Sequence, residues 1–123
     1  MPVRFELPLD DQCVGIGLPR PTPEYQFALK LEPALLAGLG QEKPRRWAVD
    51  WAFIPERLAV EVEGGYAAAG RHTSVAGFLK DMEKYNVLAC LGWRLIRVTP
   101  RDVRRGAAVT WVQRALRAVN DGT

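Results

Sequence analysis

The sequence predicts a small α/β fold in which a mixed central sheet is flanked by helices. Residues 46–54 and 58–63 alternate between apolar and other side chains and are separated by a three-residue turn. Alternation of this kind indicates strands, whereas the apolar period of residues 73–91 and 107–119 indicates helices. A short apolar run at residues 93–98 lies between the two helical segments. These observations predict the order α-β-β-α-β-α.

Bulk properties are those of one soluble domain that spans residues 1–123. The chain is 48% hydrophobic and 25% charged, and its length is enough for a real core. No apolar run approaches the roughly 20 residues that cross a bilayer, and the N-terminus lacks the apolar centre of a secretory signal. We therefore expect a cytoplasmic protein with no membrane association. Cys90 lies in an apolar stretch and is expected to be buried, and Cys13 and Cys90 make neither a disulfide framework nor a zinc site.

The N-terminal third is read from its prolines and glycines. Residues 1–20 show no sustained period and are expected to be irregular or to hold a short strand. Thr22 and Pro23 resemble a helix start, with a capping hydroxyl and a proline in the first turn, so a helix is predicted through Leu31. Pro33 should open a second helical piece, which Gly38 and Gly40 end.

The two central strands predict a hairpin that gathers acidic side chains. Phe53 and Leu58 must share the core face, and a register shift of one residue would turn a strand inside out. Alternation then places Asp50 on the same face as Glu61 and Glu63. If Ile54 pairs with Arg57, Asp50 lies directly opposite Glu61.

A helix capped by Thr73 or Ser74 should follow and run to about Leu91, where Gly92 stops it. Its predicted core side consists of Val75, Phe78, Leu79, Met82, Tyr85, Leu88 and Ala89. Because a helix separates the hairpin from residues 93–98, that third strand should return parallel. Pro100 should end the strand, and a last helix should follow at residues 107–119.

Three carboxylates on one face of neighbouring strands repel one another unless one is protonated or a cation is bound. Mg²⁺ takes oxygen ligands and can be held by a few carboxylates. The sequence therefore predicts a metal site at Asp50, Glu61 and Glu63. A solvent-facing edge hairpin is the alternative, and the large apolar residues of both strands weigh against it.

Arginine dominates the basic residues, with 13 arginines against four lysines. They cluster at Arg45 and Arg46, at Arg94 and Arg97, and at residues 101–105. The planar guanidinium matches phosphate oxygens, so the clusters favour a nucleic-acid partner. An arginine-rich solvated surface without a ligand accounts for the clusters equally well.

The string DWAFIPERLAVEVEGG, followed by GRHT, GFLKDMEKYN and GWRLIRVTP, resembles the core of the PD-(D/E)XK nucleases. It is particularly similar to small phage and bacterial members near the archaeal-type Holliday-junction resolvases. The resemblance covers residues 22–105 and implies a restriction-endonuclease-like core. A phage-encoded protein that acts in the host cytoplasm fits it as well as a bacterial one.

The resemblance also implies roles for individual residues. Asp50 and Glu61 match the two metal-binding acids, and Glu24 matches an auxiliary acid on the first helix, with Glu32 as the substitute. Glu63 stands where the family usually has lysine, although some members carry glutamate there. Lys80 and Lys84, four residues apart on one helical face, are the candidates for a lysine supplied from elsewhere. We assign Lys80 to catalysis. The residues assigned to DNA binding are Arg45, Arg46, Arg71, His72, Lys84 and Arg94.

The implied function is a Mg²⁺-dependent endonuclease, with Mn²⁺ able to substitute, that hydrolyses DNA and leaves a 5′-phosphate. The expected substrate is branched DNA, with the four-way Holliday junction as the first choice. Resolvases of this kind act as homodimers, and residues 1–20 or the last helix could supply the apolar surface. The alternatives are a nicking or repair endonuclease on linear or mismatched duplex, and a non-catalytic DNA-binding module.

Overall fold

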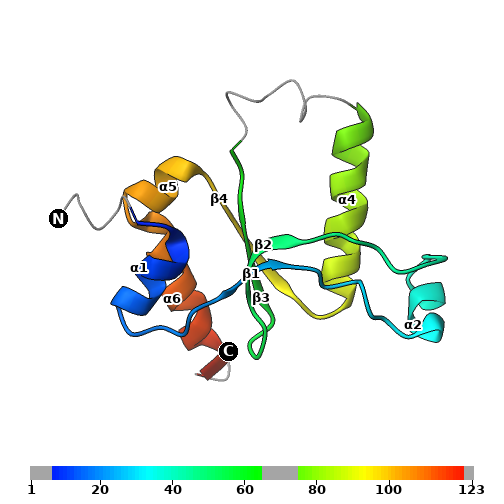
Figure 1. The fold of residues 1–123 in the computed structure, drawn as a ribbon, viewed down its shortest axis with the longest axis horizontal. Coiled ribbons are helices and arrows are strands. Elements are labelled where there is room, and N and C mark those ends of the chain that lie inside the picture. The colour runs from blue at the N-terminus through cyan, green and yellow to red at the C-terminus, as the bar shows by residue number, and fades with distance from the viewer. Residues whose placement is uncertain (1–6, 65–74, 121–123) are drawn as a thin grey trace.

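A computed structural model describes residues 7–64 and 75–120 of the chain. The elements are, in order, α1 (Leu9–Gly15), β1 (Thr22–Tyr25), α2 (Pro33–Gly38), β2 (Val49–Phe53), β3 (Leu58–Val62), α4 (Val75–Cys90), β4 (Arg94–Val98), α5 (Pro100–Arg104) and α6 (Ala107–Asn120). The four strands form one mixed sheet in the order β1-β2-β3-β4. A mixed sheet with flanking helices was predicted, and this part of the prediction is confirmed (Figure 1).

The strand register follows the predicted parity. β2 and β3 are antiparallel and pair Trp51 with Val60 and Phe53 with Leu58. β3 and β4 are parallel, with Glu61 beside Arg97. The hairpin and the parallel return after a helical crossover are therefore both confirmed.

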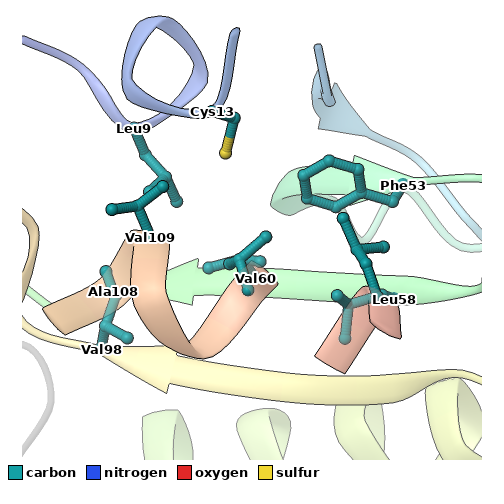
Figure 2. Packing of buried hydrophobic residues seen from close by; sticks show 10 residues of the cluster. Leu9, Cys13, Phe53, Leu58, Val60, Val98, Ala108 and Val109 are labelled. Carbon is teal, nitrogen blue, oxygen red and sulfur yellow. The ribbon is translucent and has the colours of Figure 1, made fainter. Parts of the chain in front are cut away.

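Helices cover the two faces of the sheet unequally. α1 and α6 lie with α5 on one side of the sheet, and α4 lies on the other (Figure 1). The α1 and α6 side carries a core that includes Phe53, Leu58 and Val60 together with Leu9 and Cys13 (Figure 2). The α4 side carries a second core, whose buried members are Phe27, Ala28, Val49, Ala52, Ala59, Val87, Leu88 and Trp93.

The helix predicted from Thr22 through Leu31 is wrong. Thr22–Tyr25 forms the edge strand β1, which pairs antiparallel with β2 through Pro23 beside Trp51 and Tyr25 beside Val49. Proline is tolerated on an edge strand because the missing N–H costs no ladder bond there. The same Thr-Pro pair that suits a helix start therefore suits an edge strand.

Two short helices were missed. Residues 1–20 were expected to be irregular, but Leu9–Gly15 forms α1 and buries Leu9, Gln12 and Cys13 on one side. Pro100 ends β4 as expected, and it also opens α5. Thr99 accepts a hydrogen bond from the backbone N–H of Asp102, and the Asp102 carboxylate accepts one from the backbone N–H of Thr99, so the two form a capping box.

The α4 helix was predicted with nearly the right ends, and Gly92, at φ +85°, follows it as a left-handed stop. Its predicted core side is mostly wrong. Of the seven predicted residues only Leu88 is buried and Tyr85 is partly buried, and the others are exposed, namely Val75, Phe78, Leu79, Met82 and Ala89. Val87, which was not predicted, is buried as well. Cys90 is exposed rather than buried, and both cysteines are free. Among the described residues no helix is long and apolar enough to cross a membrane.

Candidate active site

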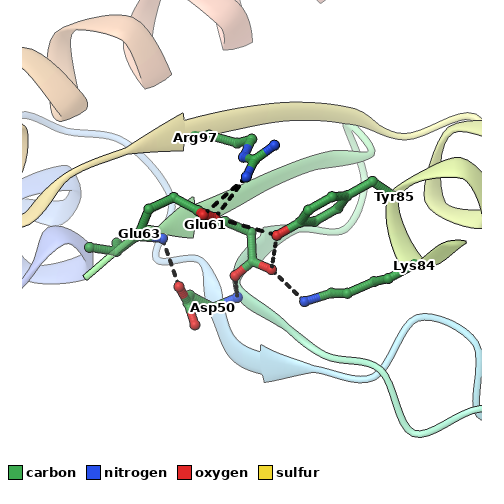
Figure 3. A network of polar contacts seen from close by, with 7 residues as sticks. Asp50, Glu61, Glu63, Lys84, Tyr85 and Arg97 are labelled. Carbon is green, nitrogen blue, oxygen red and sulfur yellow. Dashed lines mark hydrogen bonds and ion pairs between the residues drawn. The ribbon is translucent and has the colours of Figure 1, made fainter. Parts of the chain in front are cut away.

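Asp50 and Glu61 meet where β2 and β3 stop pairing through their backbones. The described ladder ends at Trp51 and Val60. Beyond it, the Asp50 N–H donates to Glu61 Oε2 at 3.2 Å, and the Val62 N–H donates to Asp50 Oδ2 at 2.7 Å (Figure 3). Each carboxylate therefore binds the backbone of the other strand. The side chains replace the ladder and hold the two acids side by side, as strand parity predicted.

Glu61 is a buried carboxylate with a cation and a phenol on its other oxygen. The residue is 7% exposed. Lys84 Nζ lies 2.5 Å from Glu61 Oε1, and the Tyr85 hydroxyl donates to the same oxygen at 3.1 Å (Figure 3). Burial raises the pKa of Glu61, the positive charge of Lys84 lowers it, and the negative charge of Asp50 raises it, with a net shift upward.

Glu63 points toward a different cation. Arg97 Nη2 donates to both Glu63 oxygens at 3.2 Å, and the Arg97 guanidinium carbon lies 4.8 Å from the centre of the Tyr85 ring. The Tyr85 hydroxyl lies 3.5 Å from Glu63 Oε1, a longer contact than the one to Glu61. Burial and the charges of Glu61 and Glu63 raise the pKa of Tyr85 far above its usual value. Tyr85 therefore stays a hydrogen-bond donor at any physiological pH.

The three carboxylates were predicted to converge, but only two of them form a pair and the third lies next to it with a different partner. Asp50 and Glu61 are adjacent, while Glu63 is paired with Arg97. Within residues 7–64 and 75–120 no three His, Cys, Asp or Glu side chains gather closely enough to hold a metal ion. Two carboxylates still suit Mg²⁺, because this ion is commonly held by one or two carboxylates together with water and substrate phosphate. Burial is the main cause of the raised pKa of Glu61, and a divalent cation would offset the smaller rise that the charge of Asp50 adds.

The α4 helix presents Lys84, and not Lys80, to the acids. Lys84 has a side chain that is 15% exposed and is paired with Glu61. Lys80, one turn earlier, is exposed and lies among the apolar residues that α4 leaves uncovered. The structure therefore places Lys84, which was assigned to DNA binding, at the acids and leaves Lys80, which was assigned to catalysis, away from them, because the helix first meets the sheet in its second half.

Glu24 is placed near Asp50 but on a strand. Its neighbours Pro23 and Tyr25 pair with Trp51 and Val49, so Glu24 occupies the position beside Asp50. Its φ of +48° departs from extended geometry, and the residue is exposed. The helix that was expected to carry it does not form. Glu32, the substitute, precedes α2 as its N-cap and is also exposed.

The arginines predicted to bind DNA fall in different places. Arg45 Nη1 donates to Gln41 and Glu83, and its guanidinium lies 4.1 Å from the Trp47 ring centre. Arg46 is exposed. Arg71 and His72 lie outside the described residues. Arg94 was assigned to DNA binding, and its guanidinium donates to the backbone carbonyl of Ala115 on α6.

Arg97, and not Arg94, lies on the face of β4 that carries the acids. The parallel register puts Arg97 beside Glu61 on the α4 face of the sheet, whereas Arg94 faces α6. Arg97 was not assigned to the site from the sequence. Tyr85 was assigned to helix packing, yet its hydroxyl contacts Glu61 and Glu63. Two sequence features could have placed Tyr85 at the site: it directly follows Lys84, and its side chain ends in a polar hydroxyl.

No protein-family model, curated protein or solved structure gives a significant match to this chain.

Proposed function

We propose that this chain is a divalent-metal-dependent endonuclease of the PD-(D/E)XK kind that hydrolyses DNA at the Asp50 and Glu61 pair. The observation that carries the proposal is the ion pair between Lys84 and Glu61. A lysine is expected near the acids of such a site, and this chain has glutamate at position 63. Lys84 would supply that missing cation from α4.

Asp50 and Glu61 are the residues that would hold the metal ion. A bound divalent cation would lower the pKa of a water and stabilise negative charge on the phosphate. The backbone bonds from Asp50 and Val62 fix one oxygen of each carboxylate and leave the pair preorganised. Glu63 is not assigned to the ion, because its carboxylate is held by Arg97.

Lys84 and Tyr85 prepare the rest of the site. The Lys84 ammonium lies at the edge of the acid pair, where it can donate to the attacking water or to a phosphate oxygen. Tyr85, kept protonated by its raised pKa, orients the Glu61 carboxylate by donating to Oε1. Lys84 and Tyr85 follow each other on α4, so the same helix positions both.

The proposed substrate is branched DNA, with a four-way junction as the first choice, cut in the cytoplasm by a homodimer. Symmetric resolution needs two nicks and hence two sites. A labelled junction and a linear duplex of the same sequence, incubated with Mg²⁺, test this choice. Paired symmetric nicks in the junction alone support a resolvase. Equal cutting of both substrates would move the function to a general or repair nuclease.

The role of Lys84 has a matched control on its own helix. Lys84→Met should reduce the cleavage rate by roughly 10²-fold, a magnitude typical of a positioned proton-transfer or electrostatic group. Lys80→Met, one turn away and exposed, should leave the rate unchanged. Thermal melting of both variants separates loss of chemistry from loss of fold. Equal rates for the two folded variants would contradict the assignment.

A further inference from the structure

The second cation of the site, Arg97, is held in an arrangement that suits phosphate. It lies beside Glu61 in the parallel register of β3 and β4, so it shares the acid face of the sheet. Its side chain is 52% exposed, which leaves the guanidinium open to a ligand. An arginine so close to the two acids lies within reach of a DNA backbone bound there.

The guanidinium is fixed in orientation by its contacts on one side. Nη2 donates to both oxygens of Glu63, and the group lies over the Tyr85 ring (Figure 3). A guanidinium has five N–H donors in one plane. Within the described part of the chain, the hydrogen bonds of Arg97 use Nη2 alone. Nη1 and Nε remain as donors for a further group.

The small contribution of the Arg97–Glu63 ion pair to fold stability is a weak explanation for its presence. An ion pair between partly exposed side chains typically contributes about 1 kcal/mol or less to stability. Arg94 on the same strand shows the contrast, because its guanidinium donates to a backbone carbonyl of α6 on the other side of the sheet. Arg97 instead presents a planar, oriented donor set at the acid pair, which is the geometry that phosphate oxygens match.

We propose that Arg97 is a phosphate-binding residue for the DNA backbone and that Glu63 is its positioning residue. Glu63 would then hold the guanidinium in place instead of holding a metal ion, which accounts for glutamate at a position where lysine is expected. The Tyr85 ring lies under the same guanidinium, and its hydroxyl donates to Glu61. This inference rests on the proposed function, since it names how that site meets its substrate.

The binding test avoids cleavage altogether. Affinity for a fluorescent four-way junction is measured in EDTA over a range of salt concentrations, for wild type, Arg97→Gln and Arg94→Gln. Arg97→Gln should bind roughly tenfold more weakly and should lower the slope of log affinity against log salt by about one, the effect of one lost phosphate contact. Arg94→Gln removes the same charge from the opposite face and should leave the slope unchanged.

The role of Glu63 is tested by measurements that a side chain with a merely structural role would not affect. Glu63→Gln should leave the Mn²⁺ concentration needed for half-maximal cleavage unchanged, whereas a metal ligand at this position would raise it. In the Arg97→Gln background, Glu63→Gln should have no further effect on kcat/KM, because the two side chains act as one unit. Additive effects, or a raised Mn²⁺ requirement, would overturn the positioning role.

The two proposals fail in different ways. Binding by wild type with equal salt slopes for the Arg97 and Arg94 variants would overturn this inference and leave the nuclease proposal standing. Absence of binding by folded wild type to the junction and to a linear duplex alike would overturn both.

Discussion

The Glu61 carboxylate couples the site to pH. Burial raises its pKa, Lys84 opposes the shift, and the charge of Asp50 adds to it. A carboxyl pKa that is higher in the folded than in the unfolded chain makes a contribution to stability that is fully present below the unfolded value of about 4.3. That contribution is lost as the pH rises through the folded pKa. The ionised Glu61 carboxylate is therefore a local cost to the fold at neutral pH.

Glu61→Gln tests this sign. The neutral amide removes the ionisation that opposes folding, so the stability of the variant relative to wild type should increase as the pH rises from about 4 to 7. Denaturant unfolding at several pH values measures the difference. A relative stability that falls with pH would show that Lys84 outweighs burial and that the pKa of Glu61 is lowered.

Some residues of the site could be predicted from the sequence, and others could not. The period of two along a strand predicted that Asp50 and Glu61 share a face, and that part of the site needs no further knowledge. Which lysine reaches them depends on where α4 meets the sheet. Because Lys80 and Lys84 lie on one helical face, spacing alone could not separate them.

At the scale of elements, local patterns failed where one signal serves two structures. Thr22 and Pro23 suit a helix start and an edge strand alike, and pairing with β2 decides between them. The apolar stripe of α4 was read as core throughout, but only its second half contacts the sheet. The choice between Arg94 and Arg97 needed the face of β4, which tertiary packing sets.

The two halves of α4 should therefore respond differently to truncation. Leu88 is 1% exposed in the second core, and its replacement by alanine should lower the free energy of unfolding by about 2–5 kcal/mol. Leu79 is 56% exposed on the same helix, and its replacement by alanine should lower the free energy of unfolding by less than about 0.5 kcal/mol. Denaturant unfolding of Leu88→Ala and Leu79→Ala compares one chemical change at two depths. Similar losses would contradict the exposed position of the first two turns.

At the scale of the whole molecule, the candidate site is assembled from elements that are far apart in sequence. The β2-β3 hairpin brings the acids, α4 brings Lys84 and Tyr85, and β4 brings Arg97 (Figure 3). The sheet order fixes β3 between β2 and β4, so Glu61 has Asp50 on one side and Arg97 on the other. A mixed α/β sheet was predictable from the alternating segments, whereas this placement of cations depends on the complete fold.

The most direct test of the central claim is cleavage of an end-labelled four-way junction by wild type and Asp50→Asn, each with Mg²⁺, Mn²⁺ or EDTA. The exchange keeps the size of the side chain and removes one of the two acids proposed to hold the ion. We predict cutting by wild type with either metal, none in EDTA, and a loss of at least about 10²-fold in the folded variant. Cutting by wild type in EDTA, or an unchanged rate for Asp50→Asn, would contradict a metal-dependent site at Asp50 and Glu61. Tight junction binding with no cutting under any metal would instead favour a non-catalytic DNA-binding module.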